Sequence, residues 1–491
     1  MTLPRFPLYI DGAFVEAAQT FESLDPATGR AWALMPAASE ADIDRAVEAA
    51  DRAFHDPAWA GLTASQRGKL LMRLGDLVAE HAGRLAELET RDTGKIIRET
   101  RAQIGYVAEY YRYFGGLADK VEGVHLPIDK PDIEVYLRRE PIGVVAAIVP
   151  WNSQLFLSAV KLGPALAAGC TIVLKASEDG PAPLLAFAEL VQEAGFPKGV
   201  VNIVTGFGEP AGRALTSHPK VSRVAFTGGP ATARQVVRNT AENLAHTTLE
   251  LGGKSPVLVF ADADLDSAAN AIVAGIFAAT GQSCVAGSRL YVERPVHDRL
   301  VEMLKDKAAA IRIGDPQDPA TEMGPLATLR QREHIEALLE RSVAAGAKIL
   351  CGGKAPADRT DGWFFEPTIV TAAGNEVPCV AEELFGPVLS IVPFEGEAEA
   401  LALANDTRYG LAAGVFTTSL TRAHRLIRQL RAGIVWVNTY RAVSPIVPFG
   451  GYGRSGLGRE GGSESILDYT RTKSVWIRTS DAPIADPFVM R

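Results

Sequence analysis

A thiol and a carboxylate stand in two glycine-containing segments of the chain. Cys284 ends a turn-like run of Gly, Gln and Ser, which differs from the apolar surroundings of a structural cysteine. Glu250 lies 34 residues earlier and is followed at once by Leu-Gly-Gly. A nucleophilic cysteine needs room for its substrate and a base or dipole that stabilises the thiolate. Cys284 is therefore a candidate nucleophile, and Glu250 is a candidate carboxylate of the same site.

Polar side chains follow two apolar runs that read as strands. Asn152 comes after the first run and supplies an amide donor that could face an oxyanion. Lys175 and Glu178 come after the second run. Ligands of an open parallel sheet bind beyond the carboxyl ends of its strands, where a Lys and a Glu can hydrogen-bond ribose hydroxyls. A solvated strand end is an equal alternative for this pair.

Glycines mark two places where a phosphate could approach the backbone. Thr227-Gly228-Gly229 follows a strand and leads directly into a helix, whose first N–H groups are free to bind an anion. An ordinary tight turn is an equal alternative. The segment 206–212 resembles a dinucleotide-binding glycine motif, but its third glycine comes one residue late, which favours a plain loop.

The elements that position these residues alternate along the middle of the chain. Short apolar runs separated by helical stretches imply right-handed crossovers and a buried parallel sheet. The expected strands are 144–149, 171–174, 200–204, 223–226 and 247–250, and the expected helices are 156–168, 184–193, 210–216 and 232–243.

A second pattern of strands and helices begins after residue 253, with a strand at 256–260 and a helix from 265. Residues 40–120 are rich in helical spacing, with one long helical pattern over 67–89. The segments 133–139 and 473–478 alternate polar and apolar residues, as exposed antiparallel strands do. The sequence therefore predicts an α/β protein with two doubly wound parallel-sheet domains and a small antiparallel element.

Size and composition exclude several classes of protein. A chain of 491 residues exceeds a single core, and 47% hydrophobic with 22% charged residues is typical of a globular protein. A net charge of −8 gives no reason to expect nucleic acid or a membrane surface as partner, and no apolar run is long enough for a membrane span. The four cysteines show no metal-ligand spacing, so we expect no metal, and a reducing cytoplasm fits best.

Seven short motifs, taken in order, resemble the aldehyde dehydrogenase superfamily over essentially the full chain. The resemblance rests on the motif order and on the spacing from Glu250 to Cys284. The motifs are Pro150-Trp151-Asn152, Lys175-Ala176-Ser177-Glu178, Phe226-Thr227-Gly228-Gly229, Glu250-Leu251-Gly252-Gly253-Lys254-Ser255-Pro256, Gly281-Gln282-Ser283-Cys284, Glu382-Glu383-Leu384-Phe385-Gly386-Pro387-Val388 and Pro448-Phe449-Gly450-Gly451.

The resemblance implies a domain organisation. Residues 1–118 and 143–252 would form an NAD(P)-binding domain, and residues 253–468 a catalytic domain. Residues 119–142 and 469–491 would form an oligomerisation element that makes dimers or tetramers.

The resemblance also implies a mechanism, the oxidation of an aldehyde to a carboxylate with NAD(P). Cys284 would carry a thiohemiacetal and then a thioester, and Asn152 with the Cys284 backbone N–H would form the oxyanion hole. Glu250 would activate the water that hydrolyses the thioester. Lys161 and Glu460 match positions thought to relay protons from this base, although a surface carboxylate is the alternative for Glu460.

The remaining implied residues bind the cofactor. Lys175 and Glu178 would hold the adenosine ribose, Glu383 the nicotinamide ribose, and Phe385 would pack beside the nicotinamide. Because a 2′-phosphate would meet the Glu178 carboxylate, we expect NAD to be preferred, with NADP possible. The full set of cofactor residues is Ile148, Pro150, Trp151, Lys175, Ser177, Glu178, Gly208, Phe226, Thr227, Gly228, Gly229, Leu251, Gly252, Glu383 and Phe385.

The chain departs from the superfamily pattern at two sites. The cofactor helix usually opens Gly-Ser-Thr, whereas here Pro230 follows Gly229 and a capping hydroxyl is lost. Many relatives have a large aromatic residue directly after the oxyanion asparagine, whereas this chain has Ser153 and Gln154. With Arg441 in the loop that lines the tunnel entrance, these residues would favour polar or anionic aldehydes, and a solvated loop cation is the alternative for Arg441.

Two other functions are alternatives to the hydrolytic oxidation of an aldehyde. A CoA-acylating relative hands the acyl group to a thiol and typically lacks a base at the Glu250 position. A non-catalytic binding or structural protein of this fold would be expected to lose Cys284, Asn152 or Glu250. The chain keeps all three, which favours the hydrolytic enzyme.

Overall fold

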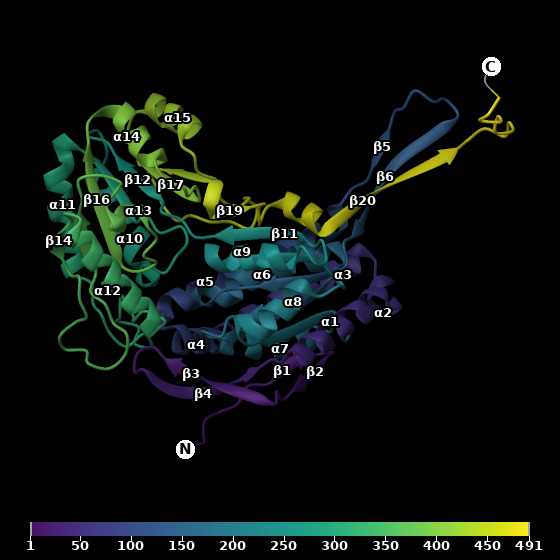
Figure 1. Ribbon diagram of the computed structural model, residues 1–491, viewed down its shortest axis with the longest axis horizontal. Coiled ribbons are helices and arrows are strands. Elements are labelled where there is room, and N and C mark those ends of the chain that lie inside the picture. Colours follow the sequence, from purple (N-terminus) through teal and green to yellow (C-terminus); the bar gives the residue numbers. More distant parts are fainter. Residues whose placement is uncertain (1, 490–491) are drawn as a thin grey trace.

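The computed structural model describes residues 2–489, so residues 1, 490 and 491 of the expected domains lie outside it. Its first sheet has eight strands in the order β19-β11-β10-β7-β8-β9-β1-β2 (Figure 1). The five central strands are parallel and correspond to the five predicted ones. The strands are β7 (Val144–Ile148), β8 (Thr171–Ala176), β9 (Val201–Thr205), β10 (Val221–Gly228), β11 (His246–Leu251), β1 (Leu8–Ile10), β2 (Ala13–Val15) and β19 (Gly456–Leu457).

Helices cover both faces of this sheet. The crossover helices are α6 (Gln154–Ala168), α7 (Ala182–Glu193), α8 (Arg213–Ser217) and α9 (Pro230–Asn239), and the helices before the sheet are α1 (Glu40–His55), α2 (Pro57–Ala60), α3 (Ala64–Glu80), α4 (Ala82–Thr93) and α5 (Ile97–Leu117). Ser39 and Thr63 each form a capping box that fixes where α1 and α3 begin. The long helical pattern predicted over 67–89 is broken at His81, which ends α3 and precedes α4.

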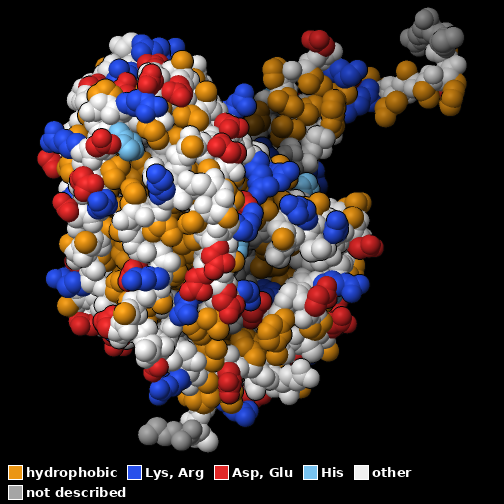
Figure 2. All heavy atoms as spheres, turned by 60° about the vertical axis from the view of Figure 1, so that its left-hand side comes forward, with side chains coloured by type: hydrophobic (Ala, Val, Ile, Leu, Met, Phe, Trp, Pro, Cys, Tyr) orange, Lys and Arg blue, Asp and Glu red, His pale blue; other side chains and the backbone are white. Residues whose placement is uncertain are grey.

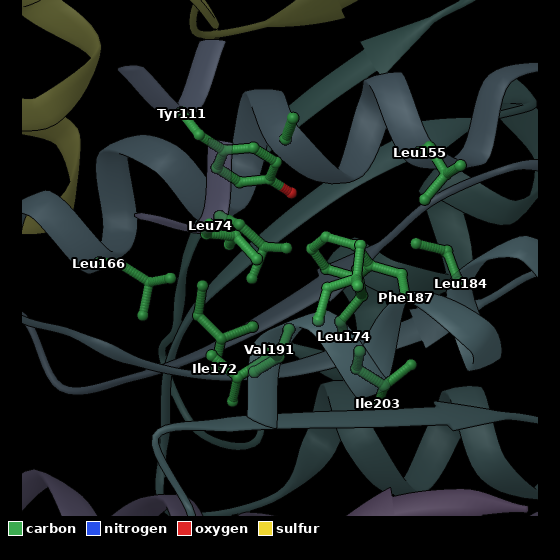
Figure 3. Close-up of a cluster of buried hydrophobic side chains, with 14 of the residues drawn as sticks. Leu74, Tyr111, Leu155, Leu166, Ile172, Leu174, Leu184, Phe187, Val191 and Ile203 are labelled. Carbon is green, nitrogen blue, oxygen red and sulfur yellow. The ribbon is translucent and has the colours of Figure 1, made fainter. Parts of the chain in front are cut away.

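The core of the first sheet is a continuous layer of apolar side chains (Figure 3). Leu174 and Ile203 from the strands meet Leu155 from α6 and Phe187 from α7, and all four are almost fully buried. Phe187 stacks on Tyr111 of α5, with 6.0 Å between ring centroids. This packing holds α5 and α6 firmly against the sheet, so the loops at the strand ends are attached to a rigid support.

A second sheet, of seven strands, has the order β14-β15-β16-β13-β12-β17-β18, and only β14 runs antiparallel. Its strands are β12 (Pro256–Val259), β13 (Arg289–Glu293), β14 (Lys348–Cys351), β15 (Thr368–Thr371), β16 (Val388–Phe394), β17 (Ala412–Phe416) and β18 (Ile434–Val437). Its helices are α10 (Leu265–Phe277), α11 (Arg294–Ala309), α12 (Leu329–Ala344), α13 (Pro378–Ala381), α14 (Gly396–Asn405) and α15 (Leu420–Gln429). Two such sheets confirm the predicted α/β fold class.

A three-stranded antiparallel sheet projects from the body as an arm (Figure 1). It consists of β5 (Val124–Leu126), β6 (Ile133–Pro141) and β20 (Thr470–Arg478), and β6 pairs with β20 along its whole length. The two predicted alternating strands are therefore confirmed as a pair. Hydrophobic side chains gather on the arm (Figure 2), including Trp476, which is 57% exposed, and Ile477.

A separate hairpin of β3 (Gln19–Asp25) and β4 (Arg30–Ala37) completes the sheets. β19 comes from the segment assigned to the catalytic domain, yet it extends the edge of the first sheet beside β11. The expected domain boundaries stay a prediction. Over the described residues, no helix is long and apolar enough to cross a membrane.

Candidate active site

A cavity of about 550 Å³ lies where the carboxyl ends of the first sheet face the second sheet. Side chains from both halves of the chain line it. They include the predicted catalytic and substrate residues Asn152, Ser153, Glu250, Cys284, Arg441 and Glu460. The structure thus brings together residues that are separated by more than 300 positions in the sequence.

The turn that carries Cys284 has an unusual backbone. After α10 ends at Phe277, three successive residues take left-handed conformations: Ala279 (φ 52°), Thr280 (φ 53°) and Gly281 (φ 71°). A Cβ on Gly281 would overlap the Gly386 carbonyl, so only glycine fits there. Thr280 Oγ1 donates to Gly324 O at 3.1 Å, which ties the turn to the loop beneath it.

Burial first, and then the nearby carboxylates of Glu383 and Glu250, raise the pKa of the Cys284 thiol to about 12, while Arg441 opposes the rise. At neutral pH the sulfur therefore holds its proton. A group that accepts this proton is required before the sulfur can attack a substrate. Glu250 lines the same cavity, and its charge is among those that act on the sulfur.

The amide of Asn152 is fixed against the nucleophile turn. Asn152 follows β7 in a short 3-10 helix (Trp151–Ser153), and its Nδ2 donates to Gln282 O at 3.0 Å. Gln282 is itself fixed, because its Oε1 accepts from Ala327 N at 2.9 Å. An amide nitrogen has two hydrogens, so Asn152 keeps one that can reach an oxygen in the cavity.

Glu250 is a buried carboxyl at the end of β11, and it is only 3% exposed. Within the described residues neither of its oxygens has a hydrogen-bond partner. Burial, then the charge of Glu460, raises its pKa well above the ordinary value, and Lys161 and Arg459 act against this rise. A carboxyl with a raised pKa is a stronger base once ionised, which suits proton removal from a thiol or a water.

A buried ion pair stands behind Glu250. Lys161, on α6, is fully buried and contacts Glu460 Oε1. Its Nζ also donates to Thr227 Oγ1 at 2.7 Å, at the end of β10. Glu460 lies in the cavity wall and is only 4% exposed. It is therefore not the surface carboxylate that was the alternative interpretation.

Glu383 and Phe385 reach the same edge from the second half of the chain. Glu383 Oε1 accepts from Gly253 N at 3.0 Å, and burial raises the pKa of this carboxyl to about 7. A Cβ on Gly252 would overlap the Glu383 carboxylate, which therefore lies directly on the glycine backbone. The ring of Phe385 meets Trp151 edge to face, with centroids 5.5 Å apart.

The other predicted cofactor residues lie along the carboxyl edge of the first sheet. Ile148, Phe226, Thr227, Gly228 and Leu251 end their strands, Pro150 and Ser177 follow β7 and β8, and Gly208 begins the turn after β9. Lys175 Nζ stands 3.9 Å from Glu178 Oε2 and donates to Ala176 O at 3.2 Å.

The start of α9 fits a phosphate group. The residue before its first turn is Gly229, and within the described part of the chain no side chain caps this helix end. A Cβ on Gly229 would meet nothing within 4 Å, so there is open space beside the free N–H groups. The loss of the capping hydroxyl therefore leaves the helix end open to an anion.

One residue predicted to contact the substrate, Gln154, lies outside the cavity. Gln154 is fully buried and does not line the cavity; its Nε2 donates to the backbone oxygens of Asp179 and Gly180. Ser153 does line the cavity, where its Oγ accepts from Lys95 Nζ at 2.8 Å. Arg441 also faces the cavity, and its Nη1 donates to Ala274 O at 3.0 Å.

Several polar residues of the cavity wall were not predicted from the sequence, among them Lys95, Glu99, Gln103 and Tyr106. They lie just before and within α5, in the helix-rich segment that precedes the first sheet. Lys95 is 7% exposed, pairs with Glu89 at 3.2 Å and bonds Gln103 Oε1 at 2.9 Å. No motif marks them, since polar residues in a helix read as its solvated face.

Comparisons with known proteins show the family of the chain. The model of the aldehyde dehydrogenase family matches residues 14–475. The chain is 61% identical over 490 residues, the full length of both proteins, to (Z)-2-((N-methylformamido)methylene)-5-hydroxybutyrolactone dehydrogenase of Acinetobacter baylyi.

Solved structures give the same result. The NAD+ complex of an aldehyde dehydrogenase from Bacillus cereus matches with a TM-score of 0.95 and 42% identity, over 97% of each chain. Betaine aldehyde dehydrogenase from Staphylococcus aureus in complex with NAD+ matches with a TM-score of 0.96 and 39% identity, over 99% of this chain and 96% of that one. The chain belongs to the aldehyde dehydrogenase family.

Proposed function

We propose that the protein oxidises an aldehyde to a carboxylate with NAD, through a thioester on Cys284. The observation that carries the proposal is the meeting of Cys284, Asn152 and Glu250 in one cavity. A nucleophile, an oxyanion donor and a base are the three groups that acyl chemistry on a thiol requires. The NAD+ complexes of the similar structures support the choice of cofactor.

The first half of the reaction forms a bond from Cys284 Sγ to the aldehyde carbon. The thiol proton passes to Glu250, and the carbonyl oxygen becomes an oxyanion that the free N–H of Asn152 stabilises. The nicotinamide, when bound, supplies the acceptor for the hydride that leaves this carbon. Loss of that hydride restores the carbonyl and leaves the substrate as a thioester on the sulfur.

The second half is hydrolysis. Glu250 removes a proton from a water molecule, whose oxygen attacks the thioester carbon, and the C–S bond breaks to release the carboxylic acid and the Cys284 thiolate. Lys161 and Glu460 adjoin the base and would receive and pass on its proton.

The same carboxyl edge would bind the cofactor. Glu383, which lies on the Gly253 N–H, and Phe385, which packs on Trp151, would hold the nicotinamide end of NAD. Lys175 and Glu178 would hold the adenosine ribose. Because Glu178 would lie against a 2′-phosphate, NAD should be preferred over NADP.

We infer a polar aldehyde that carries a carboxylate, such as a 4-oxo acid. The substrate named for the Acinetobacter relative is a 5-hydroxybutyrolactone, and such a ring is the closed form of a 4-oxo acid. Arg441 uses Nη1 for its backbone contact, and its other N–H groups make no hydrogen bond within residues 2–489. They can bind a carboxylate.

A panel of aldehydes tests the proposal, with NADH and NADPH formation and the released acid measured, in the presence and absence of CoA. Cys284→Ala should abolish oxidation and keep NAD binding. Glu250→Gln should lose ~10²–10⁴-fold in turnover. Near-normal turnover in either variant, or an acyl-CoA product, would rule the mechanism out.

Arg441→Ala tests the substrate class. It should lower kcat/KM for 4-oxobutanoate about tenfold or more relative to butanal, a neutral aldehyde of equal length. An equal change in kcat/KM for both aldehydes would show that Arg441 does not select for a carboxylate on the substrate.

We further propose that the arm joins copies of this chain into a dimer or tetramer. Trp476 and Ile477 are exposed on β20, and Val124 is exposed on β5. Exposed apolar side chains on a projecting sheet favour burial against another copy. Sedimentation of the protein and of Trp476→Lys would test this, and a monomeric parent protein would refute it.

A further inference from the structure

Glu99 reaches across from the first half of the chain to the backbone that carries the nucleophile. It lies in the first turn of α5, and its carboxylate accepts one hydrogen bond shared between both oxygens, from Ala279 N at 2.9 and 3.0 Å. Ala279 is the first residue of the left-handed turn that ends at Cys284. The contact joins residues 180 positions apart.

The conformation of Ala279 needs such support. A residue with a Cβ rarely adopts a positive φ, because the side chain crowds the backbone carbonyl. Here Ala279 (φ 52°) and Thr280 (φ 53°) both do so. Strained residues of this kind persist only where surrounding contacts hold them. Among the described residues, Glu99 is the acceptor of the Ala279 N–H.

The same peptide group is held at its other end. The carbonyl of Ala278, which belongs to the Ala278–Ala279 peptide, accepts from Arg441 Nη1 at 3.4 Å. An anion therefore binds the N–H and a cation binds the C=O of one peptide plane. Both side chains line the cavity, so the plane is fixed from α5 on one side and from the loop after β18 on the other.

We propose that Glu99 is a positioning residue, which holds the left-handed turn at Ala279 and so places Cys284 Sγ for attack. The proposal rests on the proposed role of Cys284 as nucleophile. Further bonds hold the later part of the turn: Thr280 Oγ1 donates to Gly324 O, Gln282 Oε1 accepts from Ala327 N, and Asn152 Nδ2 donates to Gln282 O. Glu99 fixes its beginning, where the chain leaves α10.

Three variants separate this role from others. Glu99→Ala removes the acceptor, and Glu99→Gln removes the charge but keeps an oxygen that can accept from Ala279 N. Ala279→Gly removes the conformational strain, because glycine adopts a positive φ readily. If Glu99 holds a strained turn, Ala279→Gly should partly restore the activity of Glu99→Ala. Glu109→Ala, at an exposed site of the same helix, is the matched control.

The assay is acylation by 4-nitrophenyl acetate, which needs neither an aldehyde nor NAD. The sulfur bonds to the acetyl carbon, the ester C–O bond breaks, 4-nitrophenolate leaves, and the thiol proton passes to the base. Cys284→Ala defines the background. Thermal unfolding and NAD binding of each variant show that it is folded.

Glu99→Ala should slow acylation about 10–100-fold, since small displacements of a reacting group cost rate steeply. Glu99→Gln should stay within about threefold of the parent, and the double variant with Ala279→Gly should recover at least about fivefold. With the best aldehyde, kcat should fall while KM stays within about threefold.

Acylation by Glu99→Ala within twofold of the parent, or a change in KM alone, would overturn the positioning role and leave the proposed function intact. A Gln variant as poor as the Ala variant, without recovery in the double variant, would also overturn it. Normal acylation by Cys284→Ala would overturn the proposed function itself, and this role with it.

Discussion

The pH dependence of hydrolysis should respond in opposite directions to the two members of the buried pair behind Glu250. Glu250 must be ionised to act as a base, and its pKa is raised by burial and by Glu460, with Lys161 opposing the rise. Activity should therefore increase with pH through the pKa of Glu250. Glu460→Gln removes a negative neighbour and should move this rise to lower pH. Lys161→Met removes a positive neighbour and should move it to higher pH.

The sizes of the two shifts should differ. At an effective permittivity of ~20, a unit charge ~6–8 Å away changes a pKa by roughly 1.5–2 units. Glu250, Lys161 and Glu460 are 3%, 0% and 4% exposed, so water screens them little. Glu460→Gln leaves Lys161 charged, so we expect the midpoint of the rise in activity to move about 1–2 pH units lower. Lys161 acts on Glu250 less strongly than Glu460 does, so Lys161→Met should move the profile by less, in the opposite direction.

Single-turnover release of the acid from acyl-enzyme, followed from roughly pH 5.5 to 9.5, measures the shifts directly. Steady-state kcat provides a second profile. Removing one partner of a buried ion pair typically costs ~3–5 kcal/mol of stability, so the unfolding midpoint of each variant is needed as a control. Profiles that move in the same direction, or that both coincide with the parent profile, would refute the electrostatic account of this base.

Other expectations concern the cofactor edge and the core. Gly252→Ala would force its Cβ into the Glu383 carboxylate and should raise KM for NAD and lower kcat about tenfold, whereas Gly83→Ala, whose Cβ meets nothing within 4 Å, should leave both constants unchanged. Glu178→Ser removes the charge that would face a 2′-phosphate and should raise kcat/KM with NADP about tenfold or more relative to NAD, measured by paired cofactor titrations. Phe187→Ala empties a fully buried site and should cost ~3–5 kcal/mol of unfolding free energy, read from denaturant unfolding with NAD absent.

The central strands were predictable because burial on both faces leaves a clear pattern. Each is a short run of apolar residues between glycines, prolines or polar residues, and β7 and β8 match the expected 144–149 and 171–174 closely. Residues placed directly after such strands share one edge of the sheet. This rule explains why Asn152, Lys175 and Glu250 could be assigned to one region from the sequence alone.

Gln154 shows where adjacency in sequence misleads. It stands two residues after Asn152, in a stretch that passes from a 3-10 turn into α6. The residue between them, Ser153, has non-helical backbone angles (φ −166°, ψ 62°), so the chain turns there and the two side chains point to different sides. The side chain of Gln154 consequently binds the backbone after β8, while Ser153 and Asn152 face the cavity.

Glu99 and Lys95 were beyond prediction for a different reason. Their segment carries a helical pattern, but nothing in that pattern tells which other part of the chain its polar face meets. Glu99 contacts a backbone N–H rather than a side chain, and a backbone partner leaves no residue type to recognise. Contacts of this kind become visible only when the position of α5 relative to Ala279 is known.

The two donors proposed to bind the substrate share a structural feature. Asn152 uses one N–H on Gln282 O, and Arg441 uses one nitrogen on Ala274 O and Ala278 O. In each case a carbonyl next to the nucleophile turn fixes a planar group and leaves other N–H groups to face the cavity. A planar group fixed through one bond loses little further freedom when it binds a ligand, so its remaining N–H groups bind more effectively.

The same hydrogen bonds from Asn152 and Arg441 also hold the site together. The carbonyls that orient both donors belong to the same stretch, residues 274–282, that delivers Cys284. Hydrogen bonds therefore tie both donors to the segment that leads to the nucleophile. Asn152 and Glu99 belong to the same half of the chain as Glu250, so their bonds to Gln282 O and from Ala279 N also fix this segment relative to Glu250.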